Sequence, residues 1–116
     1  MDSGTSKKEW SLEAAREMLA DVRERTARAV AALDALNDER SELAPGSPRL
    51  QELEAGIEEQ VRRWVREMEA LGAIVKGLWL VDFDCGAGYY CWRWPEEGLD
   101  YFHTYEDGFE GRTRIQ

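Results

Sequence analysis

Apolar side chains recur every three or four residues along two long stretches of the chain, which are separated by the sequence APGSP at residues 44–48. Steps that alternate between three and four residues are typical of helices that meet along a narrow coiled-coil seam. Ser11 is placed to cap the first helix, and Ser47 to cap a second helix that begins at Pro48. Because the connection is short, an antiparallel hairpin is predicted over residues 10–72. The two seams are Leu12, Ala15, Leu19, Val22, Thr26, Ala29, Leu33 and Leu36, and Leu50, Leu53, Ile57, Val61, Trp64, Met68 and Leu71.

After Gly72, which is placed to end the second helix, the pattern changes to short runs rich in aromatic and β-branched residues. Ten of the twelve aromatic side chains lie in residues 73–116. The expected fold is therefore α+β, a long antiparallel two-helix hairpin packed on a three-stranded antiparallel sheet. One domain is expected over residues 1–116, with a disordered leader at 1–9 and a β-meander with a glycine-rich tail at 73–116. The three predicted strands are GLWLVDFD (77–84), YYCWRW (89–94) and LDYFHTY (99–105).

A register follows if each pair of strands is joined by a four-residue loop. Phe83 then lies opposite Tyr90, and Tyr90 lies opposite His103. Arg93 is expected directly across from Asp100 on the second face. Cys91 falls on that second face with Asp82, away from His103, and a slip of one residue would invert this assignment. The predicted core face is Trp79, Val81, Phe83, Tyr90, Trp92, Trp94, Leu99, Tyr101 and His103.

The charge of the chain narrows the choice of partners. A formal net charge of −9 over 116 residues argues against nucleic acid, because phosphate binding needs a basic patch. Neither half is basic: residues 1–72 hold 11 basic and 16 acidic side chains, and residues 73–116 hold 4 and 8. No apolar stretch resembles a signal peptide or a membrane span. Cys85 and Cys91 are too few and too far apart for a zinc knuckle, and without an export signal no structural disulfide is expected. A cytoplasmic protein that binds neither nucleic acid nor membranes is expected.

The predicted helices are longer than the predicted strands. A helix of about 23 residues is roughly 35 Å long, whereas a six-residue strand spans about 20 Å. The sheet therefore leaves one end of the helical hairpin uncovered. We expect that end to pack against a second copy, which makes a homodimer.

The sequence offers several polar side chains for a site, each with an ordinary alternative. His103 suits a metal ligand or general base, but a packed strand histidine is the simpler interpretation. Glu96, in a loop, is either a solvated turn residue or turns back toward His103 or Arg112, and a set of His, Glu and Asp would suit iron, manganese or zinc. Cys91 suits a nucleophile, but packs equally well as a small apolar residue. Arg112, on a glycine-rich loop, grips an anionic ligand or ties the tail to Glu96 or to an acidic helix face.

Aromatic residues of the sheet add a further candidate surface. Trp92 and Tyr101 suit stacking on a ligand, although core packing explains most of the aromatic residues. Asp82 is expected in a charge network on the second face of the sheet, where it is solvated or, if the face is covered, paired.

The chain also resembles a known family over nearly its whole length. The motifs that carry the resemblance are WSLEAA at the helix opening, Leu71-Gly72 at the end of the hairpin, and then GLWLVDFD, YCWRWPEE, YFHTY and GFEGR. They are similar to those of the small bacterial proteins of domain-of-unknown-function family 2203. Departures at Asp84, Pro95, Phe102 and Arg114 leave one polar set intact, namely Asp82, Cys91, Glu96, His103 and Arg112. The resemblance implies no particular activity, cofactor or partner.

Two functional hypotheses follow. The first is a self-associating protein without catalysis, which binds an unidentified small molecule or protein through the aromatic sheet and the tail. The second is a small metal-binding protein or metalloenzyme with its site at His103, Glu96 and Arg112, supported by Asp82 or Cys91.

Overall fold

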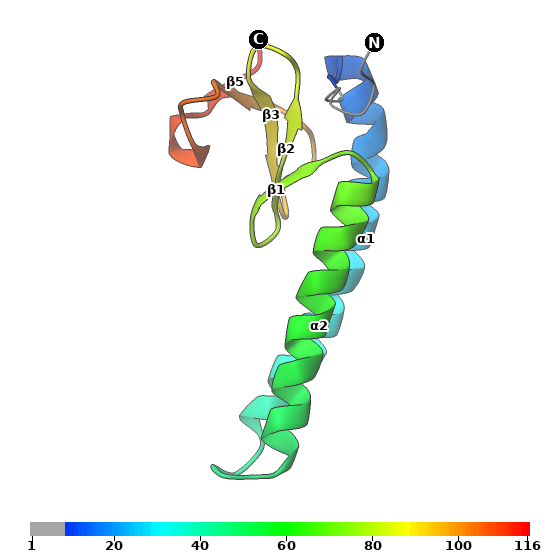
Figure 1. Cartoon of the computed structure of the whole chain (residues 1–116), viewed down its shortest axis with the longest axis vertical. Coiled ribbons are helices and arrows are strands. Elements are labelled where there is room, and N and C mark those ends of the chain that lie inside the picture. Colours follow the sequence, from blue (N-terminus) through cyan, green and yellow to red (C-terminus); the bar gives the residue numbers. More distant parts are fainter. Residues whose placement is uncertain (1–8) are drawn as a thin grey trace, which may run out of the picture.

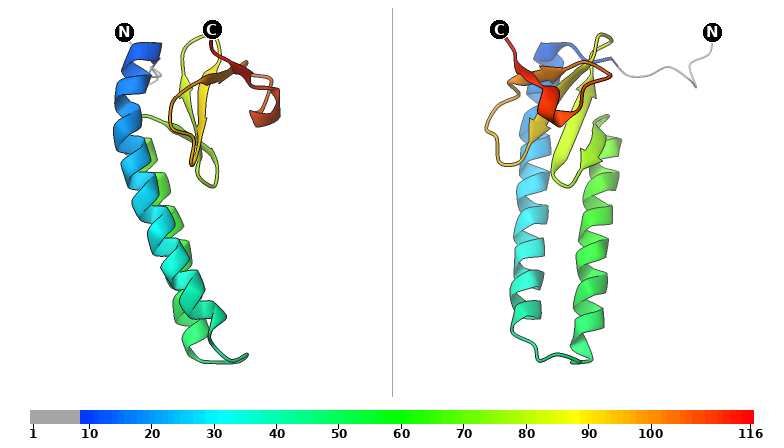
Figure 2. Two further views of the ribbon diagram at one scale, coloured as in Figure 1. Left: turned by 180° about the vertical axis from the view of Figure 1, so that it is seen from behind. Right: turned by 90° about the vertical axis from the view of Figure 1, so that its left-hand side faces the viewer.

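The structure is a computed structural model and describes residues 9–116. Two helices, α1 (Leu12–Ser41) and α2 (Arg49–Ala70), run side by side in opposite directions (Figures 1 and 2). The expected cap of the first helix is present, since the backbone N–H of Ala14 donates to Ser11 Oγ at 3.0 Å. The leader expected at residues 1–9 lies outside the described residues, except for Glu9. No helix in the described part of the chain is both long and apolar enough to cross a membrane.

The second helix begins one residue later than expected. Pro48 directly precedes the first helical residue, and the Ser47 hydroxyl still accepts a hydrogen bond from the Arg49 backbone N–H at 3.3 Å. Gly72 follows the helix with a φ of 94°, a left-handed conformation that favours glycine. Its backbone N–H donates to Glu69 O, and that of Ala73 donates to Met68 O, which closes the last turn.

The sheet has five antiparallel strands in chain order, not the three that were predicted. Residues 77–84 do not form one strand, because Leu78 and Trp79 make a tight turn in which Trp79 has a φ of 61°. The tail also adds an edge strand, which was not predicted because the tail is rich in glycine and the strand is short. The strands are β1 (Ile74–Gly77), β2 (Leu80–Asp84), β3 (Tyr89–Arg93), β4 (Tyr101–His103) and β5 (Thr113–Arg114), and a short 3₁₀ helix (Phe109–Gly111) precedes β5.

The core lies between one face of the sheet and the upper half of the helical hairpin. Trp10 closes its end, since its indole N–H donates to Gly72 O at 3.3 Å and its ring meets Phe83 edge-on at 5.2 Å. Trp79, although in a turn, packs edge-on against Trp64 of α2 at 4.9 Å. The buried apolar residues of this core include Ala15, Leu19, Val22, Trp64, Met68, Val81, Phe83, Trp92 and Leu99.

The sheet covers only one end of the hairpin. The lower half of α1 and α2 extends well past it (Figure 1), as the difference in length predicted. At 1.5 Å per residue the 30 residues of α1 span about 45 Å, whereas a five-residue strand such as β2 spans about 17 Å.

The register between β2 and β3 is the predicted one, with Val81 opposite Trp92 and Phe83 opposite Tyr90. The register between β3 and β4 differs from the predicted one. His103 lies opposite Tyr89, one position away from the predicted Tyr90. The predicted strand ends, Trp94 and Leu99, lie outside the strands, so the connection runs from residue 94 to 100 and the four-residue loop assumption was wrong.

The slip moves the side chains of β4 to the opposite face. His103 and Tyr101 leave the predicted core face and join Cys91 and Asp82, because alternate residues of a strand point to opposite sides. Asp100 lies outside β4 and pairs with Arg16 at 3.6 Å, so the predicted pairing with Arg93 is also wrong.

Candidate functional site

Asp82 and His103 form the centre of the polar face of the sheet. Asp82 comes from the middle of β2 and is fully buried, and His103, at the end of β4, is 5% exposed. His103 Nε2 lies 2.9 Å from Asp82 Oδ2. The other ring nitrogen, Nδ1, lies 2.9 Å from Thr104 O. A carbonyl oxygen only accepts hydrogen bonds, so Nδ1 carries a proton and donates it.

The proton on Nδ1 determines what lies between His103 Nε2 and Asp82 Oδ2. With Nδ1 protonated, Nε2 is a bare acceptor in the neutral imidazole, and a carboxylate is an acceptor too. The 2.9 Å contact therefore holds one proton, on the Asp82 carboxyl or on His103. Burial raises the pKa of the Asp82 carboxyl, while Cys91, His103 and Lys76 oppose that shift. Asp82 Oδ1 is buried and has no partner of ordinary hydrogen-bond geometry among the residues described, although the Cys91 thiol is a weak hydrogen-bonding neighbour of this carboxylate.

Cys91 completes a cluster of three potential metal ligands. It lies opposite Asp82 on β3 and is 1% exposed. One ligand atom from each of Asp82, Cys91 and His103 lies within 4.8 Å of the other two. Burial, and next the charge of Asp82, raise the pKa of the Cys91 thiol to about 12. The thiol is therefore protonated at neutral pH and is a poor nucleophile, although a bound metal ion would deprotonate it.

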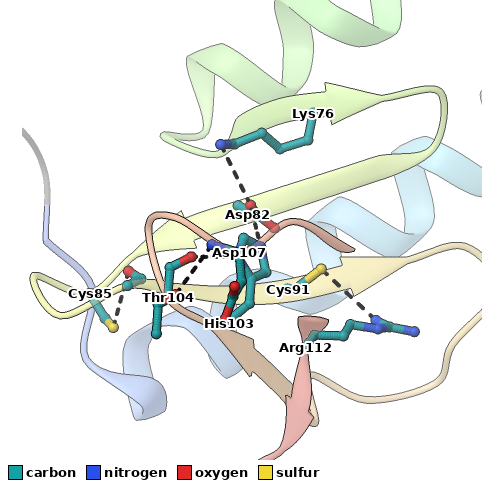
Figure 3. Close-up of polar contacts among 9 residues, drawn as sticks. Lys76, Asp82, Cys85, Cys91, His103, Thr104, Asp107 and Arg112 are labelled. Atoms are coloured by element: carbon teal, nitrogen blue, oxygen red, sulfur yellow. Dashed lines mark hydrogen bonds and ion pairs between the residues drawn. The ribbon is translucent and has the colours of Figure 1, made fainter. Parts of the chain in front are cut away.

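The cluster opens into a pocket of about 380 Å³. Lys76 of β1 reaches the pocket, with Nζ 3.9 Å from Asp82 Oδ2 and 4.2 Å from the centre of the Tyr89 ring. Figure 3 shows Lys76 of β1 and His103 of β4 on either side of Asp82 of β2, with Cys91 of β3 nearby. The opposite wall is the loop that follows β4, which includes Tyr105, Glu106, Asp107, Gly108 and Phe109.

Glu96 and Arg112 form a separate pair next to this cluster. Arg112 Nη1 lies 3.1 Å from Glu96 Oε1, and Nη2 bonds Glu96 Oε2. The guanidinium is held between the rings of Tyr101 and Phe109, at 4.0 and 4.1 Å from their centres. Arg112 Nη1 also lies 3.9 Å from Cys91 Sγ. The ion pair thus ties the tail to the β3–β4 connection, as the simpler interpretation of Arg112 expected.

The candidate residues from the sequence thus fall into two polar groups, the cluster of Asp82, Cys91 and His103 and the pair of Glu96 and Arg112. His103 contacts Asp82 and not Glu96, the partner that the sequence suggested. Cys91 and His103, which the predicted register separated, share one face. Tyr101 stacks on Arg112, whereas Trp92 is fully buried in the core and donates its indole N–H to Glu96 O at 2.8 Å.

Sequence reasoning missed Lys76 and the wall of the pocket. Lys76 lies in β1, a strand too short to stand out beside the helix end at Gly72. Its signal was the β-branched pair Ile74 and Val75 directly before a charged residue and a glycine.

The comparisons with known proteins give a family and no further relative. A search of curated proteins and a search of solved structures each found no match. One family model, described as an uncharacterized conserved protein, matches residues 8–115 and so covers nearly all of the chain. The resemblance seen in the sequence is thereby confirmed, and the chain belongs to the uncharacterized conserved family DUF2203.

Proposed function

We propose that this protein binds a divalent metal ion, zinc in particular, through Asp82 Oδ, Cys91 Sγ and His103 Nε2. The observation that carries the proposal is the buried cluster itself, with three different ligand types within 4.8 Å of one another. The orphaned Asp82 Oδ1 is a second argument, because an unpaired carboxylate oxygen is costly to bury and a cation would satisfy it.

The surroundings of His103 also fit a metal ligand. Histidines that bind metals commonly donate their other ring N–H to a carbonyl or carboxylate, which fixes the orientation of the ring. The contact from Nδ1 to Thr104 O has this geometry and directs Nε2 toward Asp82 and Cys91. Metal binding would displace the proton that His103 Nε2 and Asp82 Oδ2 share in the metal-free chain.

The ligand types favour zinc over the other metals considered. A thiolate with an imidazole suits zinc, whereas manganese prefers oxygen ligands. Glu96 is not one of the proposed ligands: it holds Arg112, whose guanidinium lies 3.9 Å from Cys91 Sγ and favours the thiolate.

Cobalt substitution tests the proposal with a matched pair of variants. Titration of the full chain with Co²⁺ is expected to produce a thiolate-to-cobalt charge-transfer band that saturates at one ion per chain. Cys91→Ser should abolish the band, while Cys85→Ser, which removes the other thiol, should keep it. The proposal is wrong if the wild type gives no band, or if Cys91→Ser binds cobalt and keeps the band.

A second proposal, self-association, is favoured by the burial of the helical seam. Beside the sheet the seam residues Ala15, Val22 and Met68 are fully buried. Toward the free end Leu33 and Leu53 of the same seams are still buried between the two helices, whereas Leu36 and Ile57 are half-buried. We infer that the free end of the hairpin, packed as a coiled coil, joins a second copy.

A further inference from the structure

We propose that the metal ion keeps one open coordination position, and that this position binds a small carboxylate, with Lys76 as the second contact. The inference rests on the proposed metal site and names the kind of ligand that the site accepts.

The number of protein ligands argues for an open position. Structural zinc sites have four protein ligands, whereas sites that exchange ligands have three and leave one position free. Within residues 9–116 the cluster holds three donors, Asp82, Cys91 and His103, and all three line the pocket of about 380 Å³. The fourth position therefore faces the pocket, which has room for a small molecule.

The charges at the inner end of the pocket favour a monoanion. A divalent ion, the Asp82 carboxylate and the Cys91 thiolate together carry no net charge. Arg112 is already neutralised by Glu96, so the positive charge of Lys76 remains. The acidic residues that also line the pocket, Glu106 and Asp107, lie on the exposed loop, where water and salt screen them.

Lys76 is placed to change partner when the metal binds. In the metal-free chain its Nζ is 3.9 Å from Asp82 Oδ2, the outer limit of an ion pair, whereas His103 approaches the same oxygen to 2.9 Å. The Tyr89 ring holds the ammonium at the pocket independently of Asp82. A metal ion that takes up the charge of Asp82 would release Lys76 to bind an anion beside it.

The experiment titrates the cobalt-loaded full chain with sodium acetate, at an ionic strength held constant with perchlorate. Acetate is expected to shift the visible d–d bands and to saturate. Lys76→Met should weaken acetate binding about ten-fold or more, and it should bind cobalt no more weakly than the wild type, because Lys76 no longer competes for Asp82. Arg66→Met removes the same charge from the outer face of α2 and should bind acetate as the wild type does.

The outcomes separate this inference from the proposal beneath it. If no thiolate-to-cobalt band forms at all, the metal site itself is wrong. If the band forms but acetate leaves the visible spectrum unchanged, the open position is wrong and the metal site stands. If Lys76→Met binds acetate as tightly as the wild type, the anion has no contact with Lys76 and the inference is overturned.

Discussion

At the scale of single residues, the effect of replacing Asp82 distinguishes a metal site from an ordinary structural ion pair. A carboxylate that is fully buried, with one oxygen unpaired, is poorly placed to stabilise the metal-free chain. If it stabilises the fold only through His103, its removal leaves a buried charge without a partner. If it is a metal ligand, its removal abolishes metal binding and costs little else.

Asp82→Asn is therefore expected to leave the free energy of unfolding of the metal-free protein within about 1 kcal/mol of the wild type. The amide of asparagine can donate to His103 Nε2 and so replaces the shared proton. Zinc at 100 times its Kd should stabilise the wild type by about 2.7 kcal/mol and the variant much less. Urea denaturation with and without zinc measures both effects. A loss of about 3–5 kcal/mol without zinc would instead identify a structural ion pair.

At the scale of the elements, α1 and α2 are joined by one buried hydrogen bond as well as by apolar packing. Trp64 Nε1 donates to Thr26 Oγ1 at 2.8 Å, and both side chains are almost fully buried. Thr26→Val keeps the shape of the side chain and leaves the indole N–H without an acceptor. The expected loss of stability is about 1–3 kcal/mol in urea denaturation. Thr26→Ser retains the hydroxyl and should lose less, and equal losses would contradict the assignment.

The ion pair between Glu96 and Arg112 holds the C-terminal tail against the β3–β4 connection. Glu96→Gln leaves the largely buried guanidinium without its counter-charge, and we expect it to cost about 1–3 kcal/mol. Glu97→Gln, at the exposed neighbouring position, should change the stability by less than about 0.5 kcal/mol. Hydrogen exchange should show faster exchange over residues 109–116 in the first variant only. Unchanged protection of the tail would show that the ion pair does not hold it.

The elements were predictable from the sequence to the extent that their signals are local. Both helices, the Ser11 cap and the β2–β3 register follow from periodicity and turn spacing, whereas β1, β5 and the β3–β4 register do not. The loop from 94 to 100 is held by contacts such as the Trp92 indole with Glu96 O, which no short pattern encodes. Because one residue of slip exchanges the faces of a strand, this single error separated His103 from Cys91 and concealed the cluster.

At the scale of the whole molecule, the free end of the helical hairpin is the largest unexplained feature. We expect the purified full chain to form a homodimer at micromolar concentration, because a second copy would cover the half-buried seam residues Leu36 and Ile57. Light scattering should give twice the monomer mass of 13.3 kDa. A monomer at micromolar concentration would contradict the predicted homodimer and leave the metal proposal unaffected.

The most direct measurement of the central claim is zinc X-ray absorption spectroscopy on the full chain loaded with one equivalent of metal. The proposed site predicts one sulfur ligand at about 2.3 Å, with the remaining ligands nitrogen or oxygen at about 2.0–2.2 Å. The sulfur shell should disappear in Cys91→Ser and persist in Cys85→Ser. A spectrum with nitrogen and oxygen ligands alone in the wild type would contradict a site built on Asp82, Cys91 and His103.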